Sequence, residues 1–246
     1  MERLTDYEQT RYNRQMLIAG WGKEGQIRLK RSSVFIAGAG GLGSTVSIYL
    51  AIAGVGEITI CDADTVELSN LNRQILHTDT RIGELKAVSA GKTLKELNPI
   101  INVVNCSDHL AENNMERIVG KPDIVVDCLD NFETRFLLNN YCIKHGIPFV
   151  HGGVRGMIGQ VAFLCPPETP CLRCILSEAS PKEIFPVVGA TPGLIGCIQA
   201  MEVLKYVTRV GTTLKGRLLV FDGEEMTFTT IEIKRARGCP DCESLG

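Results

Sequence analysis

Several polar and glycine residues are spaced as in a site that binds a nucleotide. Gly38, Gly40 and Gly43 follow the pattern G-x-G-x-x-G, with Gly41 between them, after an apolar stretch. A glycine turn between a strand and a helix surrounds one anion with backbone N–H groups and a helix N-terminus. Asp62 ends the next β-branched stretch, where an acidic side chain commonly binds ribose hydroxyls. These residues predict a nucleotide site, although a turn needed only for packing is the alternative.

A second set of residues favours a ligand with more charge than a dinucleotide. The segment Ser69-Asn-Leu-Asn-Arg-Gln74 follows Asp62 and Asp64, and Lys86 lies on the next expected helix. Two cations and two amides near a glycine turn indicate a polyphosphate. Taken singly, the arginine and the lysine are equally well explained as solvated surface residues. Taken together with the turn, they favour phosphate binding.

The segment Asp127-Cys-Leu-Asp130-Asn131 follows an apolar stretch and supplies a candidate metal ligand. Asp130 is expected at the carboxyl edge of a sheet, where open α/β folds bind their ligands. A carboxylate that faces a polyphosphate is a typical Mg²⁺ ligand. Asp130 with Glu133 also fits a helix N-cap pair, and the two roles are compatible.

The chain contains ten cysteines, and four of them form two C-x-x-C pairs far apart in the sequence. Two such pairs match a closed, structural Cys₄ zinc site that would join the C-terminus to the middle of the chain. Redox-active or disulfide pairs are the alternative, but neither pair opens a helix in a thioredoxin-like setting. The six single cysteines are expected in the core, and the four histidines show no metal-ligand spacing. The paired cysteines are Cys171, Cys174, Cys239 and Cys242.

A regular alternation of strands and helices is expected to position these residues. Thr5 and Glu8 form a capping box that opens a helix carrying Arg14 and ending near Gly20. Apolar and β-branched runs predict strands at residues 34–37, 57–61, 102–106, 124–128, 149–150, 160–164, 217–222 and 226–233. Helices are expected at residues 23–31, 44–53, 83–97, 132–144 and 194–208. The pattern predicts an α/β fold with a Rossmann-like open, mostly parallel sheet.

The expected organisation is one domain over residues 1–246, with an N-terminal helical segment, a nucleotide-binding core at about 33–165 and a zinc-stapled extension at 166–246. With 44% hydrophobic and 22% charged residues, the composition excludes disordered, collagen-like and coiled-coil classes. A net charge of −2 gives no attraction to nucleic acid or to an anionic membrane. We expect a soluble, cytoplasmic protein, because no signal peptide or membrane-spanning stretch is recognisable.

In their order along the chain, these motifs resemble the MoeB/ThiF/HesA family, relatives of the ubiquitin-activating enzymes. The resemblance also includes Arg11-Tyr-Asn-Arg-Gln15 and runs from about residue 5 to residue 242. It implies an ATP-dependent adenylyltransferase that activates the C-terminal Gly-Gly carboxylate of a small ubiquitin-like sulfur-carrier protein as an acyl-adenylate. A MoaD- or ThiS-like carrier would serve molybdopterin or thiamine sulfur transfer.

The resemblance also implies roles for individual residues. Asp62 would bind the ribose, Asp130 the Mg²⁺, and Arg14 the γ-phosphate in a neighbouring subunit, which makes the enzyme a homodimer. The paired cysteines would bind Zn²⁺, and Arg14, Arg73, Lys86 and Asp130 would act in catalysis. The implied ATP-binding set is Gly38, Gly40, Gly41, Gly43, Asp62, Asp64, Ser69, Asn70, Arg73, Lys86, Asp130 and Asn131.

The chain departs from many relatives in one respect. They carry a cysteine in the loop after the first C-x-x-C pair, used for a thioester or persulfide step, whereas residues 177–190 contain none. Cys197 is the nearest candidate downstream, and a thiol buried in an apolar helix is inert. The hypothesis is that the enzyme stops at the adenylate. A separate sulfur donor would then attack it, and because no rhodanese-like extension follows residue 246, we expect another chain.

Three other functions remain open from the sequence. An NAD-dependent oxidoreductase shares the glycine turn and Asp62 but leaves Arg14, Arg73, Lys86 and Asp130 without a role. The activated carboxylate can belong to a peptide or a small acid instead of a carrier protein. A non-catalytic scaffold that keeps the fold and the zinc site is consistent with the absent loop cysteine.

Overall fold

The computed structural model describes residues 3–176 and 186–243. The strands are β1 (Ser33–Ala37), β2 (Glu57–Cys61), β3 (Asn102–Cys106), β4 (Ile124–Asp127), β5 (Phe149–Arg155), β6 (Ile158–Leu164), β7 (Arg217–Asp222) and β8 (Thr227–Glu232). The helices are α1 (Asp6–Arg11), α2 (Asn13–Met16), α3 (Gly22–Arg31), α4 (Gly41–Ala53), α5 (Lys86–Leu97), α6 (Met115–Ile118), α7 (Phe132–His145), α8 (Leu172–Ile175) and α9 (Ala190–Thr208). Two short 3₁₀ turns, η1 (Leu68–Asn70) and η2 (Asp79–Arg81), precede α5.

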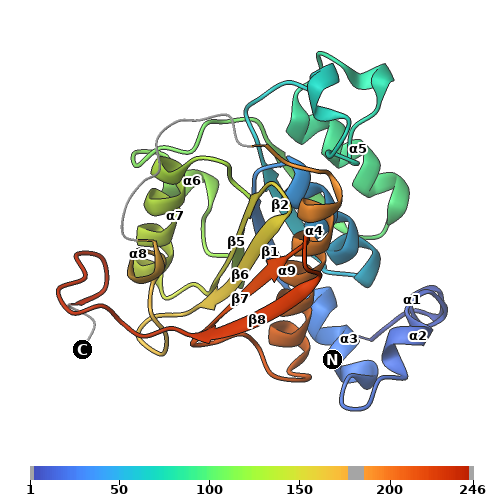
Figure 1. The fold of residues 1–246 in the computed structure, drawn as a ribbon. Coiled ribbons are helices and arrows are strands. Elements are labelled where there is room, and N and C mark those ends of the chain that lie inside the picture. The colour runs from blue at the N-terminus through green and yellow to red at the C-terminus, as the bar shows by residue number, and fades with distance from the viewer. Residues whose placement is uncertain (1–2, 177–185, 244–246) are drawn as a thin grey trace.

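All eight of these strands form one sheet in the order β3-β2-β1-β4-β5-β6-β7-β8 (Figure 1). The first five strands in this order are parallel, and β6, β7 and β8 continue the sheet as antiparallel strands. The predicted open, mostly parallel α/β sheet is therefore confirmed. The strand order reverses between β1 and β4, which places a cleft at the carboxyl ends of these strands.

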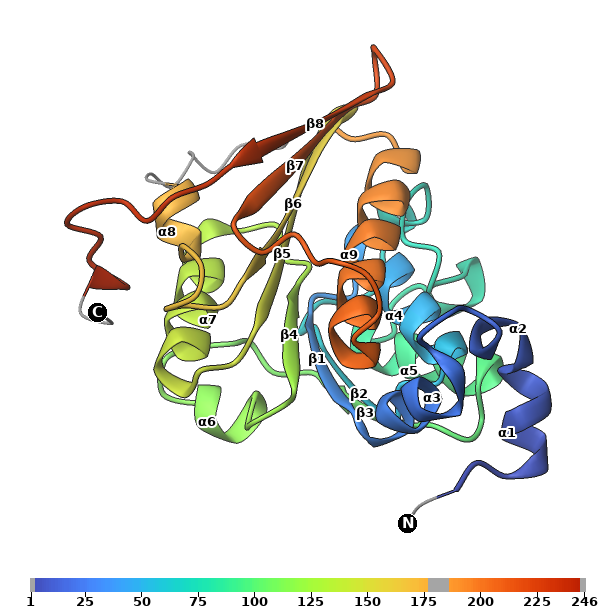
Figure 2. The ribbon, with the colours of Figure 1, turned by 90° about the horizontal axis from the view of Figure 1, so that it is seen from below.

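Helices cover both faces of the sheet. Figure 2 shows α3, α4, α5 and α9 on one face and α6, α7 and α8 on the other. Alternate residues of β1 supply the two cores: Ile36 packs with the cluster that contains Val46 of α4, and Phe35 with the cluster that contains Leu138 of α7. Strands buried on both faces are apolar at every position, which explains why they could be read from the sequence. Within the described ranges, none of the helices has the length and apolar character needed to cross a membrane.

The N-terminal helical segment differs from the prediction. The capping box of Thr5 and Glu8 is present, but α1 ends at Arg11, and the short α2 replaces a continuous helix to Gly20. Tyr12 separates the two because its side chain is buried, with its hydroxyl accepting a hydrogen bond from Asn98 Nδ2 at 2.8 Å. This tertiary anchor outweighs the local helical preference.

Candidate active site

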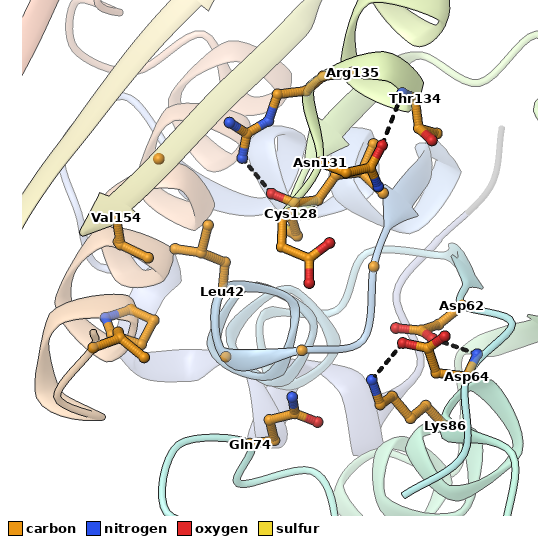
Figure 3. A pocket seen from close by; sticks show the side chains of 18 of the residues that line it. Leu42, Asp62, Asp64, Gln74, Lys86, Cys128, Asn131, Thr134, Arg135 and Val154 are labelled. Atoms are coloured by element: carbon orange, nitrogen blue, oxygen red, sulfur yellow. Dashed lines mark hydrogen bonds and ion pairs between the residues drawn. The ribbon is translucent and has the colours of Figure 1, made fainter. Parts of the chain in front are cut away.

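A cavity of about 800 Å³ opens where β1, β2 and β4 end, which is within the range of small-molecule sites. It is lined by Gly38, Gly40, Gly41, Asp62, Asp64, Arg73, Lys86, Asp130 and Asn131, all predicted as site residues. Residues from five separate places in the sequence are thus brought together. Figure 3 shows Asp62, Asp64 and Lys86 together at one side of this cavity.

The glycine turn fits an anion because side chains are excluded from it. Gly38 has a φ of +102°, and a Cβ there would lie 2.6 Å from the Cys128 carbonyl oxygen. A Cβ on Gly43 would lie 1.9 Å from the Gly38 carbonyl oxygen. Gly40 is the N-cap of α4, and no described side chain accepts a hydrogen bond from this helix end. Its first-turn N–H groups therefore suit a bound phosphate.

Asp62 and Lys86 are both held by neighbouring groups. The two carboxylate oxygens of Asp62 accept hydrogen bonds from the backbone N–H groups of Ala39, at 2.8 Å, and of Asp64, at 2.9 Å. Asp62 thus fixes the glycine turn and its own loop. Lys86 is buried, and its Nζ pairs with the exposed Asp64 carboxylate at 2.8 Å. The ammonium group is therefore present at the cavity wall with an anionic partner that a phosphate can replace.

Gln74 also lines the cavity. It ends the Ser69–Gln74 segment, but no ligand role was predicted for it from the sequence. Its side chain is 5% exposed, and its Oε1 is buried without a hydrogen bond in the described part of the chain. It faces the glycine turn, since a Cβ on Gly40 would lie 3.7 Å from Gln74 Nε2 (Figure 3). A buried amide without a partner is uncommon and indicates a group that a ligand satisfies.

Four predicted ligands do not line the cavity. Asn70 Oδ1 accepts a hydrogen bond from the Glu67 backbone N–H at 3.1 Å, so its amide stabilises the local turn. Ser69 donates to the Glu67 carboxylate, and Gly43 is packed against Gly38. Arg14 is exposed on α2. The ligand roles implied for these residues stay predictions.

Asp130 lines the cavity as an exposed residue after β4, but the predicted helix cap is wrong. The N-cap of α7 is Asn131, whose Oδ1 accepts a hydrogen bond from the Thr134 backbone N–H at 2.9 Å. Asn131 has extended backbone, with φ of −123° and ψ of 141°, as an N-cap requires. The carboxylate of Asp130 is therefore left for a ligand in the cavity.

A buried charged network lies beneath this edge of the sheet. The Asp127 carboxylate pairs with Arg135 Nε at 3.0 Å and with His151 Nδ1 at 2.7 Å. Burial opposes ionisation of Asp127, yet the Arg135 guanidinium and the hydrogen bond from His151 hold its pKa below the usual range. Burial also lowers the pKa of His151, so its imidazole is neutral at pH 7. No role for His151 was predicted from the sequence.

The two C-x-x-C pairs form one cluster, as predicted. The four sulfur atoms lie within 4.8 Å of one another, with neighbouring Sγ–Sγ distances of 3.6 and 3.8 Å. Four Zn–S bonds in a tetrahedron separate the sulfurs by about 3.8 Å, so the donor set and its spacing fit Zn²⁺. Asp241, in the second pair, binds Arg173 Nε at 2.9 Å and thereby links the two knuckles.

Burial raises the thiol pKa, and so lowers the reactivity, of five cysteines outside this cluster: Cys61, Cys128, Cys142, Cys165 and Cys197. Cys61, Cys128 and Cys142 are buried, as expected, whereas Cys106, Cys165 and Cys197 are only partly buried. Burial raises the pKa of the Cys197 thiol, the candidate downstream of the loop. Of the loop at residues 177–190, residues 177–185 lie outside the described residues.

A comparison with known families assigns the chain. The model of the ThiF family matches residues 12–242. The chain belongs to the ThiF family. It is 42% identical to the SAMP-activating enzyme E1 of Haloferax volcanii, over 96% of this chain and 89% of that protein. It is 40% identical to the sulfur carrier protein adenylyltransferase of Thermus thermophilus, over 98% of this chain and 93% of that protein.

Two further comparisons describe how much of larger proteins this ThiF-family chain matches. It is 40% identical to the adenylyltransferase and sulfurtransferase MOCS3 of Culex quinquefasciatus, of which it covers 58%. The crystal structure of E. coli MccB with ATP superimposes with a TM-score of 0.84 at 24% identity, over 98% of this chain and 76% of that one. The structural match shows the shared fold. None of these relatives' names supports an NAD-dependent oxidoreductase.

Proposed function

We propose that this ThiF-family protein uses ATP to adenylate the C-terminal Gly-Gly carboxylate of a small ubiquitin-like sulfur-carrier protein. The observation that carries the proposal is the single cavity that unites the glycine turn, Asp62, Arg73, Lys86 and Asp130. The names of the relatives from Haloferax volcanii and Thermus thermophilus support a carrier-activating adenylyltransferase. A peptide or small-acid substrate, or a non-catalytic scaffold, has no comparable support.

The reaction requires positioning and charge neutralisation more than covalent help from the protein. The carrier carboxylate attacks the α-phosphorus of ATP, the bond to the β-phosphate oxygen breaks, and acyl-adenylate and pyrophosphate result. No general base is needed, because a carboxylate is already ionised at pH 7. The N–H groups at the start of α4, Arg73 and Lys86 would stabilise the charge on the phosphates. Asp130 would hold Mg²⁺, which neutralises phosphate charge when it is bound.

The assembly and surroundings of the enzyme are part of the proposal. Cys171, Cys174, Cys239 and Cys242 would hold one structural Zn²⁺, and residues 1–246 would act as a single adenylation domain. Arg14, exposed on α2, would complete the ATP site of a second subunit in a homodimer. A separate sulfur donor would attack the adenylate in the cytoplasm. The proposal includes no nucleic-acid or membrane partner.

The test is ATP–pyrophosphate exchange with Mg²⁺ across a panel of small carriers that end in Gly-Gly. We expect exchange that depends on one carrier and is lost in Asp130→Ala. Glu133→Ala is the matched control, because Glu133 is an exposed acid three residues along that does not line the cavity. Absence of exchange with every carrier, in protein shown to bind ATP, would refute the proposal. Equal loss in both variants would refute the role of Asp130.

A further inference from the structure

The cavity has a second end that the nucleotide residues do not occupy. Glycines and apolar side chains line most of this end, together with Gln160 and Arg155. The glycines and apolar residues are Leu42, Gly153, Val154, Ile158, Gly159, Val187 and Pro192. Figure 3 shows Leu42 and Val154 on the side of the cavity opposite Asp62 and Lys86. If the ribose lies at Asp62, as the proposed function requires, the carboxylate substrate approaches from this glycine-rich, apolar end.

Gln160 ends a hydrogen-bonded chain that begins in the protein interior. Arg135 pairs with Asp127, Asp127 with His151 Nδ1, and His151 Nε2 lies 3.1 Å from Gln160 Nε2. The side chains of Asp127 and His151 are fully buried, at 0% exposure each. The chain crosses three neighbouring strands, β4, β5 and β6, and the residues at its two ends, the largely buried Arg135 and the half-buried Gln160, both line the cavity.

The direction of each hydrogen bond in this chain fixes the orientation of the Gln160 amide. The Asp127 carboxylate is held ionised and only accepts hydrogen bonds, so His151 carries its proton on Nδ1. The Nε2 of the neutral ring is then an acceptor, and the Gln160 NH₂ group must donate to it. The Gln160 carbonyl oxygen is left without a protein partner in the described residues. The assignment follows from the partners, as it must when hydrogens are not observed.

A neighbouring glycine preserves this contact. Gly153 pairs with Gln160 across the β5–β6 ladder, and a Cβ on it would lie 3.3 Å from Gln160 Nε2 and 3.5 Å from His151 Nε2. A side chain at position 153 would therefore crowd the hydrogen bond between these two residues. The sequence thus provides both the polar chain and the space that it needs.

We propose that Gln160 binds the C-terminal peptide of the acyl substrate, its carbonyl oxygen accepting a hydrogen bond from a backbone N–H of that peptide. His151 and Asp127 are the positioning residues that hold the amide in this orientation. A tail of glycines offers no side chain to recognise, so its backbone N–H groups are its only donors. An acceptor of fixed orientation, on a wall of glycines and apolar side chains that also carries Arg135 and Arg155, matches such a tail. The inference rests on the proposed function and names its substrate contact.

The first experiment compares Gln160→Leu with Gln74→Leu in the carrier-dependent exchange assay. Gln160→Leu should raise the KM for the carrier by about three- to tenfold, the value of one hydrogen bond, and leave the KM for ATP within about twofold. Gln74→Leu, at the phosphate end of the cavity, should instead raise the KM for ATP and leave the KM for the carrier nearly unchanged. His151→Ala should follow Gln160→Leu with a smaller change. Equal increases in both KM values for Gln160→Leu would overturn the proposal.

The second experiment changes the substrate, so its first comparison uses the wild-type enzyme alone. Two carriers are prepared, and in each the peptide N–H of one of the last two glycines is replaced by an ester oxygen. One ester should raise the KM by about three- to tenfold with the wild-type enzyme and cause no further change with Gln160→Leu. An ester effect of equal size in both enzymes, or none in the wild type, would overturn the assignment. If the wild type exchanges with no carrier, the proposed function fails first, and the assignment of Gln160 falls with it.

Discussion

Replacing each of two glycines of the same turn by alanine is predicted to change a different property of the protein. Gly43→Ala should lower the stability of the fold, whereas Gly40→Ala should weaken the binding of ATP. A Cβ on Gly43 would lie 1.9 Å from the carbonyl oxygen of Gly38 and 2.9 Å from its carbonyl carbon. Both atoms belong to the backbone and cannot move without displacing the turn. A Cβ on Gly40 has Gln74 Nε2, at 3.7 Å, as its nearest neighbour, an ordinary van der Waals distance. That Cβ enters the space between the turn and Gln74, where a phosphate is proposed to bind.

The magnitudes follow from these contacts. Gly43→Ala overpacks a buried turn, which costs about 1–3 kcal/mol of the free energy of unfolding or more. For a chain of this size, each kcal/mol lowers the Tm by about 2–4 °C, so we expect a decrease of about 2–12 °C. Gly40→Ala should change the Tm by less than about 2 °C. Gly40→Ala should instead remove one hydrogen bond to a charged phosphate. That loss weakens ATP binding by about 1.5–3 kcal/mol, which raises the Kd for ATP roughly 10- to 150-fold.

The assay measures thermal unfolding and ATP binding by calorimetry on the same preparations. The wild-type protein and Gly83→Ala serve as controls. Position 83 has no heavy atom within 4 Å of a Cβ, but its φ of +87° strains any side chain. Gly83→Ala therefore reports backbone strain without a clash. If Gly43→Ala unfolds at the same temperature as the wild-type protein, the close contact is relieved at no cost, and if it unfolds no earlier than Gly83→Ala, the contact costs no more than backbone strain does. If Gly40→Ala binds ATP as tightly as wild type does, the phosphate does not lie against this turn.

Three further predictions concern the zinc cluster, the buried network and the covalent step. Metal analysis should find about one zinc per chain, and Cys239→Ser should lose it and lower the Tm. The free energy of unfolding, measured in urea from pH 8 to 3, should fall below pH ~6.5 as His151 protonates only in the unfolded chain, and again below pH ~4 as the lowered pKa of Asp127 is approached. Asp127→Asn should flatten the fall below pH ~4 and cost about 3–5 kcal/mol at pH 7, because Arg135 loses its buried partner. Cys197→Ala should adenylate normally, and no reducible enzyme–carrier conjugate should appear on a non-reducing gel; one abolished by this substitution would refute the absence of a thioester.

Six strands could be predicted to within one residue at each end, because each is largely an apolar or β-branched run bounded by polar or turn residues. The strand expected at 149–150 was predicted too short, since β5 continues to Arg155, and β6 begins at Ile158 instead of residue 160. Local sequence signals are weaker where tertiary contacts decide the ends of elements. The helix expected from residue 44 begins at Gly41, since its glycines have no side chains to show a helical period. The helix expected from residue 194 begins at Ala190, and its N-cap, Gly189, packs against the Asn72 carbonyl oxygen.

Some residues of the candidate site could likewise be predicted from the sequence, and others could not. The glycine turn, Asp62, Arg73, Lys86 and Asp130 could be predicted because each lies in a short local motif with a recognised spacing. The network beneath them has no such motif. Asp127 and His151 meet because β4 and β5 pair in parallel register, and His151 meets Gln160 because β6 pairs with β5 in the antiparallel direction. Register is set by the sheet as a whole, so a single sequence does not show these contacts.

The change of strand direction at β6 gives one cavity room for the two proposed substrates. In the parallel part of the sheet, only carboxyl ends of strands reach the cleft, and these carry the nucleotide residues. Because β6 runs antiparallel to β5, its first residues, Ile158 to Gln160, lie beside the carboxyl end of β5. The first residues of β6 therefore line an additional part of the cavity. They place peptide backbone and the Gln160 amide where a parallel strand would have required a crossover helix. The proposed nucleotide and the extended peptide would then share one cavity, which Asp130 also lines.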